Sequence, residues 1–142
     1  MLFASIILEG EENDLGRCLK FVNLYGPYGD CHSFWEYLRD QEFLKWHNLI
    51  LRGDLNLTLS AREIWDASVR QDPLSPFFCQ LLEEANLVDI EPSQLVLTWR
   101  NARGGNACIY KRLNRFLMAE HFVMELKRYR SWVGLGVSHI IV

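Results

Sequence analysis

Two features are scarce in this 142-residue chain, paired cysteines and long apolar runs. Its cysteines form no C-x-x-C pair and have no spacing typical of a zinc site; they are Cys18, Cys31, Cys79 and Cys108. We therefore predict reduced thiols in a cytoplasmic or nuclear protein, with Cys79 and Cys108 buried in the core. Metal-ligand spacing is also missing from His32, His47 and His121, which we expect on the surface or in loops.

The apolar run at residues 2–8 is too short to span a bilayer, and acidic residues follow it directly. It also lacks the basic flank and the cleavage site of a signal peptide. No other segment is a membrane candidate, and neither repeats nor low-complexity tracts are visible. The composition, 49% hydrophobic and 23% charged, is typical of a globular protein, and the length predicts one domain over residues 1–142.

Charge is distributed unevenly along the chain. Residues 100–142 hold 8 of the 15 basic residues and 2 of the 18 acidic ones, a net charge of +6, although the whole chain carries −3. Two interpretations stay open for this basic third, a surface that faces nucleic-acid phosphates and an ordinary solvated surface. If DNA is a partner, we expect the contact to involve residues 100–130.

The hydrophobic pattern predicts a mixed α/β or α+β layered domain. Strands are expected at residues 2–8, 17–25, 48–52, 95–99, 107–117 and 137–142, with a turn at 9–16 and an extended piece at 87–90. Helices are expected at residues 33–46 and 76–85, where apolar positions follow helical spacing. The first helix should bury Phe34, Trp35, Leu38 and Leu44. Residues 55–71 are expected to be a loop with one helical turn.

The most informative local motif is Gly-Asp-Leu-Asn at residues 53–56, directly after an apolar strand. In extended backbone, Asp54 and Asn56 would point to the same side. A carboxylate there can orient or deprotonate a water, and a carboxamide can donate a hydrogen bond to a phosphate oxygen. The simpler interpretation is a polar turn, because both residue types are common in turns.

Four further segments place polar side chains near strand ends. They are Asn-Leu-Tyr-Gly-Pro at 23–27, Thr-Trp at 98–99, Arg-Leu-Asn-Arg-Phe at 112–116 and Ser-His at 138–139. Taken in order with Gly-Asp-Leu-Asn, they resemble the motifs of the endonuclease/exonuclease/phosphatase family, most closely the endonuclease domains of non-LTR retrotransposons. The resemblance covers about residues 17–142, nearly the whole chain.

This resemblance implies a two-sheet β-sandwich flanked by helices, with a phosphodiesterase site that uses Mg²⁺ or Mn²⁺ at a sheet edge. By the resemblance, Asp54 orients the attacking water and is the candidate metal ligand. Asn56 and Tyr25 contact the phosphate, and His139 stabilises the charge that develops on it. Asn114 stands at the position that holds the histidine, while Thr98 and Trp99 support either the site or the wall that faces DNA.

The chain departs from the family pattern in three places. Asn114 replaces the Asp of the Arg-Leu-Asp-Arg segment, the Asp expected before His139 is absent, and the N-terminal Asn and metal-binding Glu have no counterpart. The histidine thus loses a charged partner, and a hard divalent ion loses carboxylate ligands. We therefore expect a truncated domain with weak metal binding, a degenerate or partial nuclease copy that self-associates through exposed sheet edges.

Two alternatives stay open, so the sequence leaves enzyme status undecided. One is an active metal-dependent endonuclease, whose missing ligand comes from a partner or from Glu9, Glu11 or Glu12. The other is a non-catalytic nucleic-acid-binding or scaffold protein that keeps the fold. Metal-dependent DNA nicking would favour the first, and salt-sensitive DNA binding without nicking would favour the second.

Overall fold

The computed structural model describes residues 5–12, 16–66, 70–94, 97–126, 128–134 and 137–141. Its main sheet has five strands in the order β1-β2-β3-β8-β5. These strands are β1 (Ser5–Glu12), β2 (Arg17–Tyr25), β3 (Leu49–Asp54), β8 (Asn114–Ala119) and β5 (Leu87–Asp89). In this order β3 lies at the centre of the sheet. The pair β2–β3 is parallel, and the other three pairs are antiparallel.

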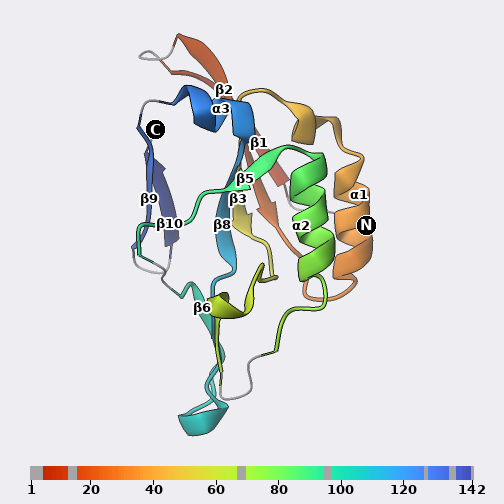
Figure 1. The fold of residues 1–142 in the computed structure, drawn as a ribbon, viewed down its shortest axis with the longest axis vertical. Coiled ribbons are helices and arrows are strands. Elements are labelled where there is room, and N and C mark those ends of the chain that lie inside the picture. Colours follow the sequence, from red (N-terminus) through yellow and green to blue (C-terminus); the bar gives the residue numbers. More distant parts are fainter. Residues whose placement is uncertain are drawn as a thin grey trace.

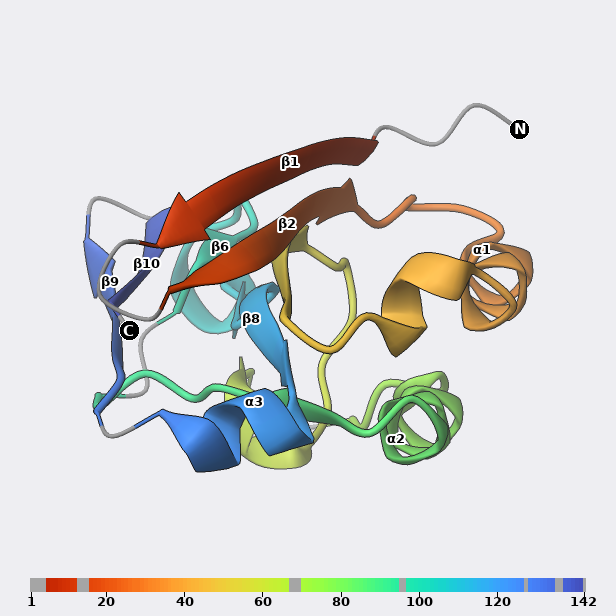
Figure 2. The ribbon, with the colours of Figure 1, turned by 90° about the horizontal axis from the view of Figure 1, so that it is seen from above.

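Two helices cover one face of this sheet. Helices α1 (Cys31–Arg39) and α2 (Ser75–Glu84) lie side by side, and a 3-10 helix, η1 (Glu42–Lys45), follows α1 (Figures 1 and 2). The sheet side of this core includes Val22, Leu24, Leu49, Leu51 and Leu117, and the helix side includes Phe34, Trp35, Leu38, Leu44, Phe78 and Leu81. The expected buried set of the first helix is therefore confirmed.

The other face is covered by α3 (Glu120–Glu125) and the antiparallel pair β9 (Arg130–Gly134) and β10 (Val137–Ile141). The core on this side contains Leu19, Ile50, Phe116, Met118 and Phe122, with Ile140 of β10 packed against it. Alternate residues of a strand point to opposite faces, so Leu49 and Ile50 of β3 belong to different cores. A sheet buried on both faces confirms the expected layered α/β class.

A smaller sheet forms the lower end of the molecule in Figure 1. It has the order β4-β7-β6, with β4 (Ile64–Trp65), β7 (Tyr110–Lys111) and β6 (Trp99–Arg100). The 3-10 helix η2 (Ala61–Glu63) leads into β4, and the 3-10 helix η3 (Gly105–Ala107) forms the tip between β6 and β7. No helix in the described part of the chain is long and apolar enough to cross a membrane.

Several expected boundaries were wrong. Residues 9–12 were expected in a turn but belong to β1, where Glu9 pairs with its register partner Lys20 at 3.2 Å. The helix expected at 33–46 ends at Arg39, because Gln41 adopts extended backbone before η1 begins. The strand expected at 107–117 is divided between β7 and β8, and these lie in different sheets. Helix α3 and strand β9 were not expected, and residues 95–96 lie outside the described residues.

The four cysteines are free, as expected, but Cys79 is exposed rather than part of the core. It follows the buried Phe78 in α2, whose Leu81 and Leu82 are also buried. Successive helical residues are about 100° apart, so the position after Phe78 turns away from the sheet. Cys108 is half-buried near the tip of the β6–β7 hairpin, outside the main cores.

Candidate functional site

Three of the candidate residues stand in one row across the main sheet. Tyr25 is the last residue of β2, Asp54 is the last of β3, and Asn114 is the first of β8. The strand register pairs Tyr25 with Asp54 and Asp54 with Asn114. Directly opposed residues in a sheet have Cβ atoms roughly 4.5–5.5 Å apart on the same face. The fold thus brings together side chains that are 29 and 60 positions apart in sequence.

We call Tyr25, Asp54 and Asn114 the sheet-end row. Alternation along each strand places the row on the face that β9, β10 and α3 cover. In β3 this face carries Ile50, and in β8 it carries Phe116. Tyr25 is half exposed and Asp54 is partly buried, so the row lies where the covered face opens to solvent.

The row depends on close backbone approach between the ends of β2 and β3. The Gly26 N–H donates to the Asp54 carbonyl at 2.7 Å. A Cβ on Gly53 would lie 1.7 Å from the Leu24 carbonyl oxygen, and Gly53 has φ +155°. A Cβ on Gly26 would lie 2.3 Å from the Leu55 carbonyl oxygen. Glycine is therefore required at both positions, which explains the first residue of the Gly-Asp-Leu-Asn motif.

Asn56 holds the turn after β3 together. Its backbone is left-handed, with φ +52°, and its N–H donates to Oδ1 of Asp54 at 3.0 Å. Its side-chain amide donates to the Gly26 carbonyl oxygen, which joins this turn to the end of β2. Its Oδ1 is buried without a hydrogen-bond partner among the described residues. Asn56 thus joins the turn after β3 to the end of β2 beside the row. This arrangement agrees with the simpler interpretation of Gly-Asp-Leu-Asn as a polar turn.

The chemistry of the row centres on Asp54. Partial burial raises the pKa of its carboxyl group, and the hydrogen bond from the Asn56 N–H opposes this in part. A raised pKa makes the carboxylate a better proton acceptor than an ordinary Asp. Tyr25 brings a hydroxyl and Asn114 a carboxamide to the same row, and both can hydrogen-bond a phosphate oxygen. This set can bind an oxyanion and position one water.

Thr98 fixes the start of β8. Its Oγ1 accepts hydrogen bonds from the N–H groups of Leu113 at 2.8 Å and Asn114 at 3.0 Å. The N–H of Leu55 in turn donates to the Leu113 carbonyl at 3.0 Å. The threonine therefore supports the position of Asn114 beside Asp54, although its own side chain is outside the row.

His139 lies in β10, where Trp132 of β9 is its register partner. Its side chain lies outside what the structure describes, so a contact between His139 and Asp54 stays a prediction. Within the described residues, no three or more His, Cys, Asp or Glu side chains gather closely enough to hold a metal ion. Asp54 is the single carboxylate of the sheet-end row, and this donor set fits a hard divalent ion poorly.

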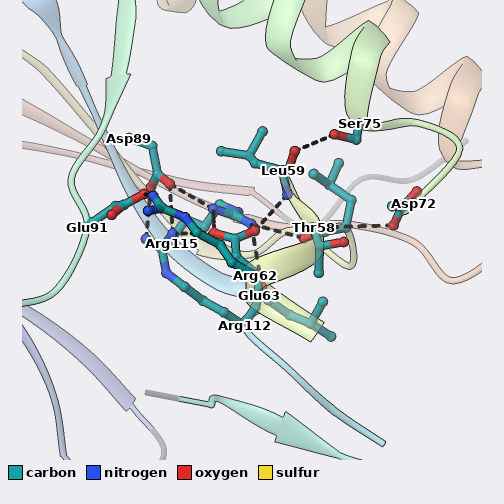
Figure 3. A network of polar contacts seen from close by, with 12 residues as sticks. Thr58, Leu59, Arg62, Glu63, Asp72, Ser75, Asp89, Glu91, Arg112 and Arg115 are labelled. Atoms are coloured by element: carbon teal, nitrogen blue, oxygen red, sulfur yellow. Dashed lines mark hydrogen bonds and ion pairs between the residues drawn. The ribbon is translucent and has the colours of Figure 1, made fainter. Parts of the chain in front are cut away.

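A buried ion network lies on the opposite, helix-covered face (Figure 3). Arg112 donates to Glu63 at 2.7 Å and to both carboxylate oxygens of Asp89 at 2.8 and 2.9 Å. Arg115 donates to Asp89 at 2.7 Å and makes two hydrogen bonds to Glu63. Both arginine side chains are at most 1% exposed. The network joins η2, β5 and β8 behind the sheet-end row.

Within the network, the charged forms of Glu63 and Arg112 are favoured. Burial alone would raise the pKa of Glu63, but hydrogen bonds and charge from Arg115, with the Leu59 N–H and Arg112, lower it overall. Burial likewise disfavours the charged form of Arg112, and Asp89 and Glu63 outweigh it, so its pKa is raised. Two positive charges are thus matched by two negative ones inside the protein.

Sequence reasoning missed Glu63 and Asp89 and misplaced the two arginines. Arg112 and Arg115 were counted in a basic third that faces solvent, but they are buried. The available signal was their spacing, because arginines three apart at the start of a buried strand need carboxylate partners. Those partners come 49 and 23 positions earlier for Arg112, so the sequence alone does not identify them.

Comparison with known proteins supports the fold. No family model matches the chain, and no curated protein does. Among solved structures, the chain is similar to the endonuclease domain of TRAS1, a telomere-specific non-LTR retrotransposon, with a TM-score of 0.66 and 17% sequence identity. The match covers 89% of this chain and 55% of that domain, so the chain spans about half of its structural relative. The fold is therefore endonuclease-like.

Proposed function

We propose that this chain is a degenerate or partial copy of a metal-dependent DNA endonuclease domain whose own catalysis is lost or very weak. The observation that carries the proposal is the sheet-end row. Asp54 is held beside Tyr25 and Asn114 at one end of an endonuclease-like sheet, and the position next to Asp54 carries a carboxamide instead of a second carboxylate.

The loss of rate follows from the donors in the row. Phosphodiester cleavage in this family needs a divalent ion that neutralises charge, together with a positioned water. Mg²⁺ or Mn²⁺ would use the Asp54 carboxylate, and we propose that the ion binds weakly with so few ligands. The side-chain amide of Asn56 donates a hydrogen bond to the Gly26 carbonyl oxygen, which supports a role for Asn56 in shaping the turn.

A plasmid-nicking assay with Mg²⁺ and Mn²⁺ tests the proposal in the wild type, Asp54→Ala and Asn114→Asp. We expect no metal-dependent nicking above the Asp54→Ala background. Asn114→Asp should not restore it, because a repaired histidine partner cannot replace an ion. Nicking by the wild type that Asp54→Ala abolishes would instead establish an active endonuclease, the first alternative.

A second function, nucleic-acid binding without cleavage, is favoured by the β6–β7 hairpin. Arg100 and Arg103 are exposed there. With Trp65 and Tyr110 they line a hollow of about 530 Å³. Arginines can contact phosphates and aromatic rings can stack on unpaired bases, so this hollow suits a single-stranded or distorted nucleic acid. DNA binding that weakens with salt would support this function.

A further inference from the structure

Two histidines that are 74 positions apart meet on the surface. His47, in the loop between η1 and β3, places its Nδ1 2.7 Å from Nε2 of His121, the second residue of α3. The two ring centroids are 4.2 Å apart with an interplanar angle of 70°. Neither residue belongs to the sheet-end row or the ion network. Their separation in sequence explains why no metal-ligand spacing was visible.

The backbone on both sides of the pair is held in place. Beside His47, the Asn48 side chain donates to the Cys18 carbonyl at 3.0 Å, and Leu49 is fully buried. Beside His121, the Glu120 N–H donates to the Asn86 carbonyl at 2.8 Å, and the Phe122 side chain is 1% exposed. Fixed neighbours reduce the conformational freedom that a ligand would otherwise have to remove, so the pair is preorganised.

Two oxygen-bearing side chains line the same cavity as the pair. A cavity of about 210 Å³ is lined by His47 and His121 together with Glu84 and Asn86. Glu84 accepts a hydrogen bond from Gln80 at 2.7 Å, which holds its carboxylate near the end of α2. Two imidazoles, a carboxylate and a carboxamide therefore share one small space that opens to water.

We propose that His47 and His121 bind a transition-metal ion of the class that prefers imidazole, Ni²⁺, Cu²⁺ or Zn²⁺. Metal–nitrogen bonds are about 2.0–2.1 Å, so a tetrahedral ion holds two nitrogens roughly 3.3 Å apart. The two side chains need to separate by only about half an ångström from the observed 2.7 Å to admit the ion. Water molecules complete the coordination, because no third His, Cys, Asp or Glu side chain of the described residues lies close enough to join the two histidines.

The proton of the present hydrogen bond must leave the metal-binding nitrogen. In a neutral pair, one ring donates its N–H and the other accepts. On metal binding, the donating ring moves this proton to its other nitrogen, and both facing nitrogens then present lone pairs. No oxidation and no net proton release are required.

This site is separate from the one in the proposed function. A nuclease-type ion such as Mg²⁺ prefers carboxylate oxygens, as at Asp54, whereas the borderline ions Ni²⁺, Cu²⁺ and Zn²⁺ prefer imidazole. The two sites therefore predict different metals and different residues. A negative result for the histidine site therefore does not contradict the proposed function, and a negative result for the proposed function does not contradict the histidine site.

Isothermal titration with Ni²⁺ in the presence of a non-chelating reductant tests the site. We expect one ion per wild-type chain and no comparable binding of Mg²⁺ at this position. Loss of a residue that only supports a metal ligand costs roughly tenfold to a hundredfold in metal affinity. Loss of a ligand itself should cost no less, so His47→Ala and His121→Ala should each lower the Ni²⁺ affinity at least about tenfold. His32→Ala is the matched control, because His32 pairs with Glu36 on α1.

A second measurement guards against a variant that is merely misfolded. Ni²⁺ should raise the melting temperature of the wild type and of His32→Ala, but not of His47→Gln or His121→Gln. Circular dichroism confirms that each variant is folded. Unchanged Ni²⁺ affinity in both His47 variants, or Ni²⁺ binding abolished by Asp54→Ala or by thiol blocking, would overturn the assignment.

Discussion

At the end of β3, close backbone contacts leave no room for a side chain at Gly53. Gly53→Ala places a Cβ against the Leu24 carbonyl oxygen at 1.7 Å, at a φ of +155° that L-residues rarely adopt. Where the backbone conformation suits alanine, a Gly→Ala change stabilises a protein by up to ~1 kcal/mol, because it restricts the unfolded chain. Where the conformation does not suit alanine, as at Gly53, the change destabilises by more than this amount. We expect urea unfolding to show a loss of at least about 2 kcal/mol.

Gly29→Ala is the matched control for this change. A Cβ at Gly29 meets no heavy atom within 4 Å, and the position lies in the exposed loop before α1. Its stability should stay within about 0.5 kcal/mol of the wild type. Equal stability of the two variants would show that β2 and β3 approach less closely than described.

Asp54 should lower stability at neutral pH, because burial disfavours its charged form. Its folded pKa is raised by burial, so its contribution is most favourable below the unfolded value of about 3.9 and is lost as pH rises through the folded value. Asp54→Asn removes the buried charge, and Oδ1 can still accept the Asn56 N–H. Melting curves should show a larger gain for Asp54→Asn at pH 7 than at pH 3. A loss at pH 7 would contradict the raised pKa.

At the level of elements, the ion network determines how η2, β5 and β8 are joined. Glu63→Gln keeps the shape of the side chain but leaves Arg112 and Arg115 short of one negative charge in the interior. Breaking a buried ion pair on one side costs roughly 3–5 kcal/mol. We expect chemical denaturation of Glu63→Gln to show a loss in this range.

Arg62→Gln is the control for the network, one position away. Arg62 pairs with Glu91 on the surface, where their side chains are 64% and 45% exposed. Exposed pairs contribute about 0–1 kcal/mol, so this variant should be close to the wild type in stability.

The lowered pKa of Glu63 adds a pH test. The stabilisation that Glu63 contributes is present above about pH 4.3 and is lost as pH falls through its folded pKa. Glu63→Gln should therefore flatten the acid side of the stability profile.

The sequence predicts elements well where the pattern is local. The buried side chains of the first helix and the bounds of β2 follow from spacing within one segment. The break between β7 and β8 does not, because it is set where Arg112 turns inward to carboxylates on other elements. Residues 9–12 were missed for a related reason, since Glu9 is stabilised in β1 by Lys20 on the next strand.

The candidate site shows the same division. The motif order identified Tyr25, Asp54 and Asn114, and the strand register aligns them in one row. The hydrogen bond from Asn56 to Gly26 was not predictable, because it depends on the left-handed turn that joins two strand ends. Contacts of this kind form only when the sheet is assembled, so motif spacing alone carries no information about them.

For the molecule as a whole, burial changes what the basic third can do. Residues 100–142 carry a net charge of +6 in sequence, but Arg112 and Arg115 are neutralised inside the protein by Glu63 and Asp89. The described basic side chains that remain accessible in this region include Arg100, Arg103 and Lys111 near the β6–β7 hairpin. Any electrostatic attraction for DNA must therefore act through a smaller set of charges than the sequence suggests.

The double variant Arg100→Gln and Arg103→Gln tests that smaller set. Each phosphate contact contributes about 0.9 to the slope of log K against log salt for duplex DNA, and about 0.7 for single strands. If both arginines contact phosphates, the slope should fall by about 1.4–1.8 in the double variant, with weaker binding at low salt. Fluorescence anisotropy over a salt series measures this on duplex and single-stranded oligonucleotides. Lys45→Gln, an exposed basic residue on η1, should leave the slope unchanged. An equal slope in the double variant and the wild type would remove the hairpin from the nucleic-acid interface.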